Sequence, residues 1–106
     1  MNTITWPPIS AERLWQRVKM LSSFTKADIP WTRSAFSTEF SEARNWLRDE
    51  FKAAGLSVSQ DAAGNLIGRR EGLNDKKPPL VTGSHCDTVV GGHSISEAIL
   101  RMGNPV

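Results

Sequence analysis

The sequence has a single cysteine and no long hydrophobic run. Cys86, standing alone, excludes an internal disulfide, which agrees with a reducing compartment. No apolar run approaches the roughly 20 residues that a membrane-spanning helix needs. Residues 1–8, MNTITWPP, contain neither the basic region nor the apolar region of a secretory signal. We therefore expect a cytoplasmic protein with no membrane partner.

Clustered charge is also missing. Thirteen Lys and Arg residues are spread among eleven Asp and Glu residues, the formal net charge is +2 and the pI is near 9.0. Basic blocks never exceed two consecutive residues, whereas a nucleic-acid surface needs cations gathered on one face. We therefore expect no nucleic-acid partner. What remains, 106 residues of which 39% are hydrophobic, is ordinary for one small globular domain.

The N-terminal third predicts an extended arm followed by a helix. Two consecutive prolines make residues 1–9 extended, because each proline fixes φ and removes an amide donor. Ser10 can cap a helix that fades near Thr25 and is excluded at Pro30. Its apolar stripe has helical spacing and consists of Leu14, Val18 and Leu21.

A second helix is the clearest element in the sequence. Ser37 or Thr38 can cap it, and Gly55 follows its last periodic residue, where a left-handed conformation costs glycine nothing. Its apolar face consists of Phe40, Ala43, Leu47, Phe51 and Ala54.

Three strands are predicted after the second helix. Residues 56–60 alternate apolar and polar side chains, residues 61–64 have turn composition, and residues 65–70 can form the return strand. Residues 80–85 begin apolar and end in small polar residues, which is typical of a buried strand that delivers a side chain to a site. Two helices and three strands indicate an α/β fold.

The end of this third predicted strand carries an H-x-D triplet. A histidine that ligates zinc usually has its second ring nitrogen held by an acceptor, and Asp87 is close enough to His85 to serve. Ligands in open α/β sheets gather outside the carboxyl ends of strands, where His85 is expected. Taken alone, the triplet is weak evidence for a metal site, and it favours an ordinary surface histidine or one satisfied within a core.

Four segments surround and include this triplet. They are TRSAFS at 32–37, AAGL at 53–56, DAAGNLIG at 61–68 and TGSHCDTVVGG at 82–92. In order and spacing they resemble the zinc-dependent amidase and carbamoylase branch of the metallopeptidase-like amidohydrolases. This branch includes N-carbamoyl-L-amino-acid hydrolases, allantoate amidohydrolases and β-ureidopropionases. The resemblance covers residues 31–92.

The resemblance implies that His85 binds one of two divalent ions, usually zinc or manganese, and that Asp87 orients its ring. It implies hydrolysis of a non-peptide C–N bond in N-carbamoyl or ureido compounds, by a metal-activated water whose proton a glutamate takes. It also implies a homodimer. The expected fold is a partial α/β/α sandwich of a di-zinc amidohydrolase catalytic domain, with two N-terminal helices and then about three strands. Residues 10–92 would be its N-terminal part, after the arm at 1–9 and before a divergent tail at 93–106.

The sequence departs from this family after Gly92. There the family continues into an F/Y-D-G motif whose aspartate bridges both ions, but no aspartate follows Asp87 here. The family's general-base glutamate, remaining histidine ligands and dimerisation domain also lack counterparts. A catalytic zinc normally takes three protein ligands, so we expect a truncated, inactive chain that does not retain the ions. We also expect a marginal fold with exposed apolar surface; the alternative function is a non-catalytic fragment or a small partner-binding domain.

Four other features have an ordinary interpretation beside a functional one. His93 and Glu97 could supply ligands from one face of a helical tail, although Glu97 and Arg101 also form an ordinary surface pair. Cys86 could be a nucleophile or a soft ligand, but strand alternation favours packing. The resemblance implies that Thr32-Arg33 approaches the active site, although Arg33 could equally pair with a local carboxylate. Core and docking surfaces explain the tryptophans better than a ligand platform does; these are Trp6, Trp15, Trp31 and Trp46.

Overall fold

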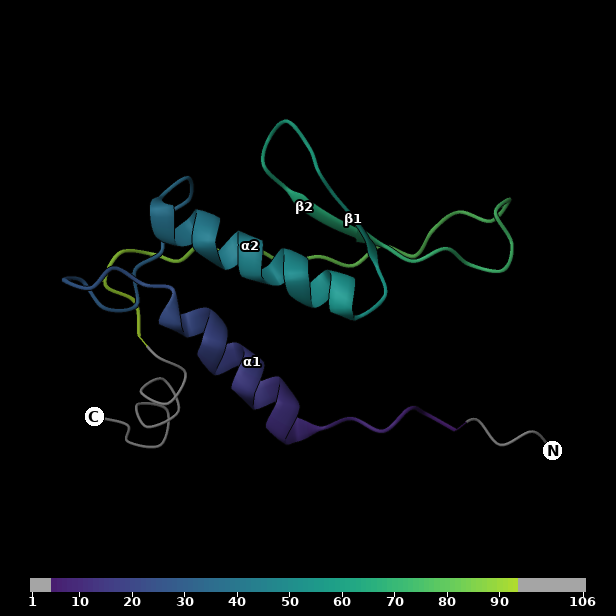
Figure 1. The fold of residues 1–106 in the computed structure, drawn as a ribbon, viewed down its shortest axis with the longest axis horizontal. Coiled ribbons are helices and arrows are strands. Elements are labelled where there is room, and N and C mark those ends of the chain that lie inside the picture. The colour runs from purple at the N-terminus through teal and green to yellow at the C-terminus, as the bar shows by residue number, and fades with distance from the viewer. Residues whose placement is uncertain (1–4, 94–106) are drawn as a thin grey trace, which may run out of the picture.

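The computed structural model describes residues 5–93, which form two helices and one two-stranded antiparallel sheet (Figure 1). In chain order these are α1 (Ala11–Ser23), α2 (Thr38–Ala53), β1 (Ser57–Gln60) and β2 (Leu66–Arg69). Neither helix has the length and apolar character that would let it cross a membrane. The proposed tail ligand Glu97 lies outside the described residues.

Local sequence explains where α1 begins and ends. The Ser10 hydroxyl accepts a hydrogen bond from the Arg13 amide at 3.2 Å, directly before the first helical residue. Glu12 lies in the first turn, where the helix dipole favours a negative charge. The last helical residue is Ser23, so the predicted extent of this helix is confirmed.

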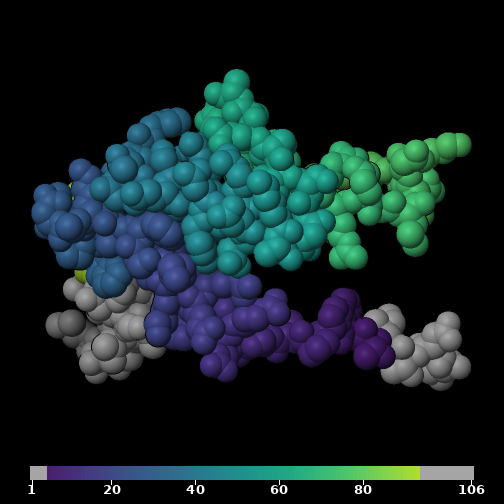
Figure 2. Space-filling model, in the orientation of Figure 1, coloured from purple at the N-terminus to yellow at the C-terminus, as the bar shows by residue number. Residues whose placement is uncertain are grey.

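The apolar stripe of α1 is covered at its C-terminal end. Val18 and Leu21 are half-buried, whereas 61% of Leu14 is exposed. Two contacts join α1 to α2, which lie side by side in Figure 2. The ring centroids of Phe24 and Trp46 are 6.1 Å apart, and Arg17 Nε lies 2.5 Å from Glu50 Oε2.

Helix α2 has the cap and the stop that the sequence predicts. Of the two candidate caps it is Ser37 that acts, since its hydroxyl accepts from the Phe40 amide at 3.1 Å. Gly55 follows the C-cap with φ of 85°, a left-handed conformation that most side chains resist. Ala43, in the middle of the helix, is completely buried.

The predicted hairpin is confirmed. Strands β1 and β2 pair in antiparallel register from Ser57 opposite Arg69 to Gln60 opposite Leu66. Asp61 closes the turn between them: its Oδ1 accepts from the amides of Ala63 at 3.1 Å and Asn65 at 2.9 Å. Its Oδ2 accepts from the Asn65 side chain at 2.8 Å.

The hairpin packs against α2 at a point where no side chain fits. A Cβ added to Gly68 of β2 would lie 2.7 Å from Phe51 Cδ2 and 2.8 Å from Leu56 Cδ1. The strand backbone therefore rests directly on these two side chains. Arg48 of α2 also donates to Gln60 Oε1 of β1 at 2.7 Å, which ties the helix to the first strand.

The predicted buried strand at 80–85 is not found, and this prediction was wrong for the described chain. Residues 80–85 have no strand partner within residues 5–93, and Leu80 and Val81 are 100% and 81% exposed. A strand forms when a neighbour completes its backbone hydrogen bonds, and the sheet described here consists of β1 and β2 alone. Two helices and a two-stranded sheet are compatible with part of an α/β fold.

Little of the described chain is buried. Ala43 is the apolar residue that is fully enclosed, and the other buried residues of the described range are Thr32 and Arg33. The radius of gyration is 17.3 Å, against about 12–13 Å for a compact chain of similar length. The expectation of exposed apolar surface is confirmed, and the best enclosed side chains beside Ala43 are polar.

Candidate metal-ligand site at the His85 loop

The chain after β2 runs outward and then returns behind α2 toward the connection between the two helices (Figure 1). The returning segment, residues 84–92, is called here the His85 loop. It contacts residues 31–33 of the helix connection through hydrogen bonds to Cys86, Thr88 and Gly91. Residues more than fifty positions apart in the sequence therefore meet at this point.

His85 and Asp87 are in contact in the way the H-x-D spacing suggests. His85 Nδ1 lies 3.0 Å from Asp87 Oδ1 and 3.0 Å from the Asp87 carbonyl oxygen. Both partners are acceptors, so in the neutral ring this arrangement favours the tautomer with the proton on Nδ1 and the lone pair on Nε2. The ring is neither packed in apolar surroundings nor turned away from the acid.

The imidazole is accessible. The His85 side chain is 80% exposed, and the Asp87 side chain is 44% exposed. Because Nδ1 is occupied by Asp87, Nε2 is the nitrogen left to bind a further group. This is the arrangement in which proteins present histidine to a metal ion, with the acceptor fixing both tautomer and ring orientation.

Arg33 reaches the His85 loop from the helix connection. Its Nε donates to the Cys86 carbonyl at 2.6 Å, and its Nη1 donates to the carbonyls of Leu21 at 2.7 Å and Phe24 at 2.8 Å. The sequence predicts that Arg33 either approaches the active site or pairs with a local carboxylate. The hydrogen bonds of its side chain go to main-chain carbonyls, and one of these carbonyls belongs to Cys86, the residue next to His85.

Burial of the Arg33 guanidinium has an electrostatic consequence. Arg33 is 6% exposed, and this loss of solvent lowers its pKa, while the nearby Cys86 and Asp87 act in the opposite direction. A buried charge requires hydrogen-bond partners. The three carbonyl oxygens supply them, so the cost of burying the charge is offset by well-directed acceptors.

Main-chain contacts complete the attachment of the loop. Arg33 and Thr88 exchange two bonds: the Thr88 amide donates to the Arg33 carbonyl, and the Arg33 amide donates to Thr88 Oγ1, each at 2.8 Å. Thr32 Oγ1 accepts from the Gly91 amide at 2.8 Å. The Thr32 amide in turn donates to Thr25 Oγ1 at 2.8 Å.

Backbone conformation at both ends of this attachment is unusual. Trp31, directly before Thr32, has φ of 59°, a left-handed value that is rare for a bulky residue. Gly91 has φ of 65°. The two segments approach closely, since a Cβ added to Gly92 would lie 3.0 Å from the Trp31 carbonyl oxygen.

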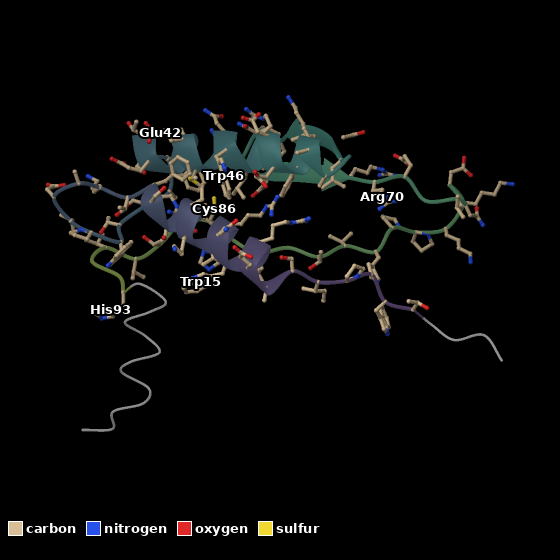
Figure 3. The ribbon with its side chains drawn as sticks, turned by 60° about the horizontal axis from the view of Figure 1, so that its bottom comes forward. Trp15, Glu42, Trp46, Arg70, Cys86 and His93 are labelled. Carbon is tan, nitrogen blue, oxygen red and sulfur yellow. The ribbon has the colours of Figure 1, made fainter. Side chains whose placement is uncertain are left out.

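Cys86 lies on the inner side of the loop, toward the helices, whereas His93 lies on the outside (Figure 3). Cys86 is half-buried, and burial raises the pKa of its thiol, with Arg33 acting in the opposite direction. A raised pKa disfavours the thiolate, which is the reactive form. This environment suits the packing interpretation of Cys86 better than the nucleophile.

The donor set of the described chain fits one bond to a metal ion. His85 Nε2 suits zinc or manganese, but within residues 5–93 no group of three His, Cys, Asp or Glu side chains could hold an ion. A shallow depression between α1 and α2 is separate from the His85 loop. It is lined by Arg13, Gln16, Arg17, Met20, Trp46 and Glu50.

Sequence reasoning missed two residues that organise the loop, Thr88 and Gly91, whereas it singled out Thr32 together with Arg33. Periodicity gives no indication of them, because they lie in irregular segments. The sequence points to this contact in one place: Thr32 and Arg33 are adjacent polar residues in an irregular segment, directly after Trp31. The four tryptophans are dispersed, from half-buried Trp46 against Phe24 to Trp6 at 79% exposed.

Comparison with known proteins identifies relatives, although no family model matches the chain. An N-carbamoyl-L-amino-acid amidohydrolase of Paenarthrobacter aurescens is 40% identical over 89 residues, which are 84% of this chain and 22% of the relative. One of Geobacillus stearothermophilus is 42% identical over 79% of this chain and 21% of its own length. An allantoate amidohydrolase of Bacillus subtilis is 36% identical over 62% of this chain and 16% of its own length.

By name these relatives are amidohydrolases, and the chain is similar to them over most of its length. More narrowly, it belongs by sequence to the family that contains the N-carbamoyl-L-amino-acid amidohydrolases and the allantoate amidohydrolases. The chain spans about a fifth of the length of these N-carbamoyl-L-amino-acid amidohydrolases.

Proposed function

We propose that this chain supplies one metal-binding histidine, His85, and its orienting carboxylate, Asp87, to an amidohydrolase that cleaves C–N bonds of N-carbamoyl or ureido compounds. The observation that carries the proposal is the contact of His85 Nδ1 with Asp87, which leaves Nε2 facing solvent. The names of the relatives support the substrate class.

Zinc or manganese, as a pair of ions, would activate the attacking water and polarise the scissile carbonyl when bound. The part of this chain in that chemistry is to hold and orient. His85 would bind the metal ion through Nε2. Asp87 would keep the proton on Nδ1 and make the lone pair of Nε2 a better electron donor to the ion. The small-molecule substrate and the homodimer that the family resemblance implies belong to the same proposal.

Residues 5–93 do not offer the donor set of a complete catalytic site. A catalytic zinc normally has three protein ligands, and the described side chains bring His85 alone into position, with Asp87 behind it. We therefore expect the chain of 106 residues by itself to bind zinc weakly and to be inactive.

The test joins a binding measurement to an activity measurement. Zinc chloride is titrated into the ¹⁵N-labelled chain, and the imidazole nitrogens of His85 and His93 are followed by long-range ¹H–¹⁵N spectra. We expect the Nε2 resonance of His85 to shift at lower zinc concentration than either nitrogen of His93, and His85→Ala to remove the effect. His93→Gln is the matched control.

Hydrolysis of N-carbamoyl-L-amino acids and of allantoate is then followed by product release, with zinc or manganese present. We expect none. Turnover that His85→Ala abolishes would overturn the expected inactivity while leaving the metal role in place. Equal zinc responses of the two histidines would overturn the metal role itself.

An alternative function, a non-catalytic partner-binding chain, is favoured by one observation. Apolar side chains on both sides of His85 face solvent: Leu80 and Val81 precede it, and Val89 and Val90, at 74% and 68% exposed, follow it. Exposed apolar clusters mark association sites. This surface is tested below through the association state of the chain.

A further inference from the structure

The structure assigns a positioning role to the dipeptide Thr32-Arg33: it fixes the chain after His85, so that the Asp87 carboxylate stands against Nδ1 of the ring. The importance of this role for catalysis rests on the proposed function. The positioning itself rests on the hydrogen bonds of the described residues.

The dipeptide Thr32-Arg33 is buried against the His85 loop. Thr32 and Arg33 are 1% and 6% exposed in a chain whose other side chains are mostly accessible. Each places a polar side-chain group on the His85 loop, Thr32 Oγ1 on the Gly91 amide and Arg33 Nε on the Cys86 carbonyl. Buried polar groups that satisfy one another specify a single arrangement.

The His85 loop is anchored on the C-terminal side of His85. Segment 80–84, before His85, is exposed to solvent, and within the described chain the hydrogen bonds that hold this region begin at His85 itself. The bonds to the helix connection are made by Cys86, Thr88 and Gly91, all after His85. The location of the ring therefore depends on its C-terminal side, where Asp87 lies between two anchored residues.

The planar guanidinium of Arg33 links the His85 loop to the end of α1. One guanidinium serves carbonyl oxygens in two directions, toward the end of α1 with Nη1 and toward the His85 loop with Nε. A lysine has the same charge but a single ammonium on a flexible stem, and it lacks this rigid planar fork. Arg33→Lys therefore keeps the charge and removes the geometry.

The test measures the tautomer of His85 in the full chain. Because the Asp87 carboxylate can accept a hydrogen bond from Nδ1–H, the neutral ring is expected as the Nδ1–H form, which long-range ¹H–¹⁵N spectra distinguish from the Nε2–H form. Arg33→Lys and Thr32→Val should both reduce the Nδ1–H population, in the direction that Asp87→Asn produces. Exchange of the Thr88 and position-91 amides should accelerate by up to about tenfold, the equivalent of one hydrogen bond.

Matched controls are Arg70→Lys and Thr82→Val, at exposed positions outside these contacts; Arg70 directly follows β2 and lies beyond the ends of both helices in Figure 3. Helix content measured by circular dichroism separates positioning from general unfolding. If Arg33→Lys loses helix, Thr88→Val provides the second test, since it removes the side-chain bond to Arg33 without touching α1.

An unchanged His85 tautomer in folded Arg33→Lys and Thr32→Val would overturn the inference. A changed tautomer without preferential zinc binding at His85 would leave the positioning role intact and overturn the proposed metal role. Preferential zinc binding at His85 that Arg33→Lys and Thr32→Val leave unchanged would support the proposed metal role and overturn the positioning role.

Discussion

At the scale of single residues, the His85 loop is held by conformations and contacts that few residue types permit. Trp31 and Gly91, on the two segments that meet, both have positive φ. For an L-residue such a conformation costs about 1–2 kcal/mol, so Trp31 stores strain that the hydrogen bonds of Thr32, Arg33 and Thr88 offset. Gly91 adopts its conformation without that cost.

Gly91→Ala should therefore weaken the attachment of the loop by about 1–2 kcal/mol. The penalty is purely conformational, because no atom lies within 4 Å of the added Cβ. Gly83→Ala is the matched control: its Cβ also meets open space, and its φ is not positive. The measurement is hydrogen exchange of the position-91 amide, and equal exchange in the two variants would contradict the prediction.

Asp61 gives a residue-scale prediction about pH. Hydrogen bonds from the Asn65 side chain and from the amides of Asn65, Ala63 and Gly64 favour the carboxylate, so the pKa of Asp61 is lowered from its usual value. A group with a depressed folded pKa contributes stability that is present above its unfolded pKa and is lost as the pH falls through the folded pKa.

The hairpin turn should therefore loosen as the pH falls from the usual pKa of an aspartate toward the lowered pKa of Asp61. Asn65→Ala should raise the pKa of Asp61 toward its usual value, because it removes the largest contribution. Asn74→Ala, in the exposed loop, is the control. A carboxyl-detected NMR titration of Asp61 measures the effect, and identical curves for both variants would refute this explanation.

At the scale of elements, α2 and the hairpin are joined by more packing and hydrogen-bond contacts than α1 makes with them. The helix has a serine cap and a glycine stop, and Phe51 on α2 together with Leu56 receives the backbone of β2 at Gly68. Arg44 and Arg48 add bonds from α2 to the Gly64 carbonyl and to Gln60. Helix α1 joins this unit through fewer contacts, chiefly those of Phe24 and Arg17.

Gly68→Ala should separate the hairpin from α2. The added Cβ would meet Phe51 and Leu56 closer than 3.0 Å, and overpacking of this kind costs about 1–3 kcal/mol. Gly72→Ala is the matched control, since nothing lies within 4 Å of its Cβ. Exchange of the β1 and β2 amides should accelerate in Gly68→Ala alone, and protection equal to that of Gly72→Ala would contradict the packing described here.

At the scale of the whole molecule, exposed apolar surface is the dominant feature. The buried apolar core of residues 5–93 is Ala43, while Leu80, Val81, Val89 and Val90 face solvent. Because hydrophobic burial is the main driving force of folding, we expect a chain with so little of it to have marginal stability and a tendency to associate.

We expect the chain to associate as its concentration rises, through segments 80–81 and 89–90. Replacing Leu80 and Val81 by serine should move light-scattering masses toward the monomer. Leu73→Ser, at an equally exposed but isolated leucine, is the control. A soluble monomer that unfolds cooperatively in urea at all concentrations would contradict both the association and the marginal stability.

The sequence by itself determined the elements whose causes are local. Ser10 and Ser37 cap the helices, Gly55 ends α2, and Asp61 with its neighbours turns the hairpin. The contact between His85 and Asp87 is equally local, since the residues are two positions apart. Each of these depends on a few neighbouring residues whose chemistry is visible in the order of the letters.

Tertiary structure decided what depends on distant partners. The segment at 80–85 has the composition of a strand, yet it is not one in the described chain, because a strand requires a neighbour that no composition supplies. Arg33 and Cys86 lie 53 residues apart, and Thr32 and Gly91 lie 59 apart. Their meeting depends on where both helices direct the chain, so only the three-dimensional arrangement reveals which polar residues hold the loop that presents His85.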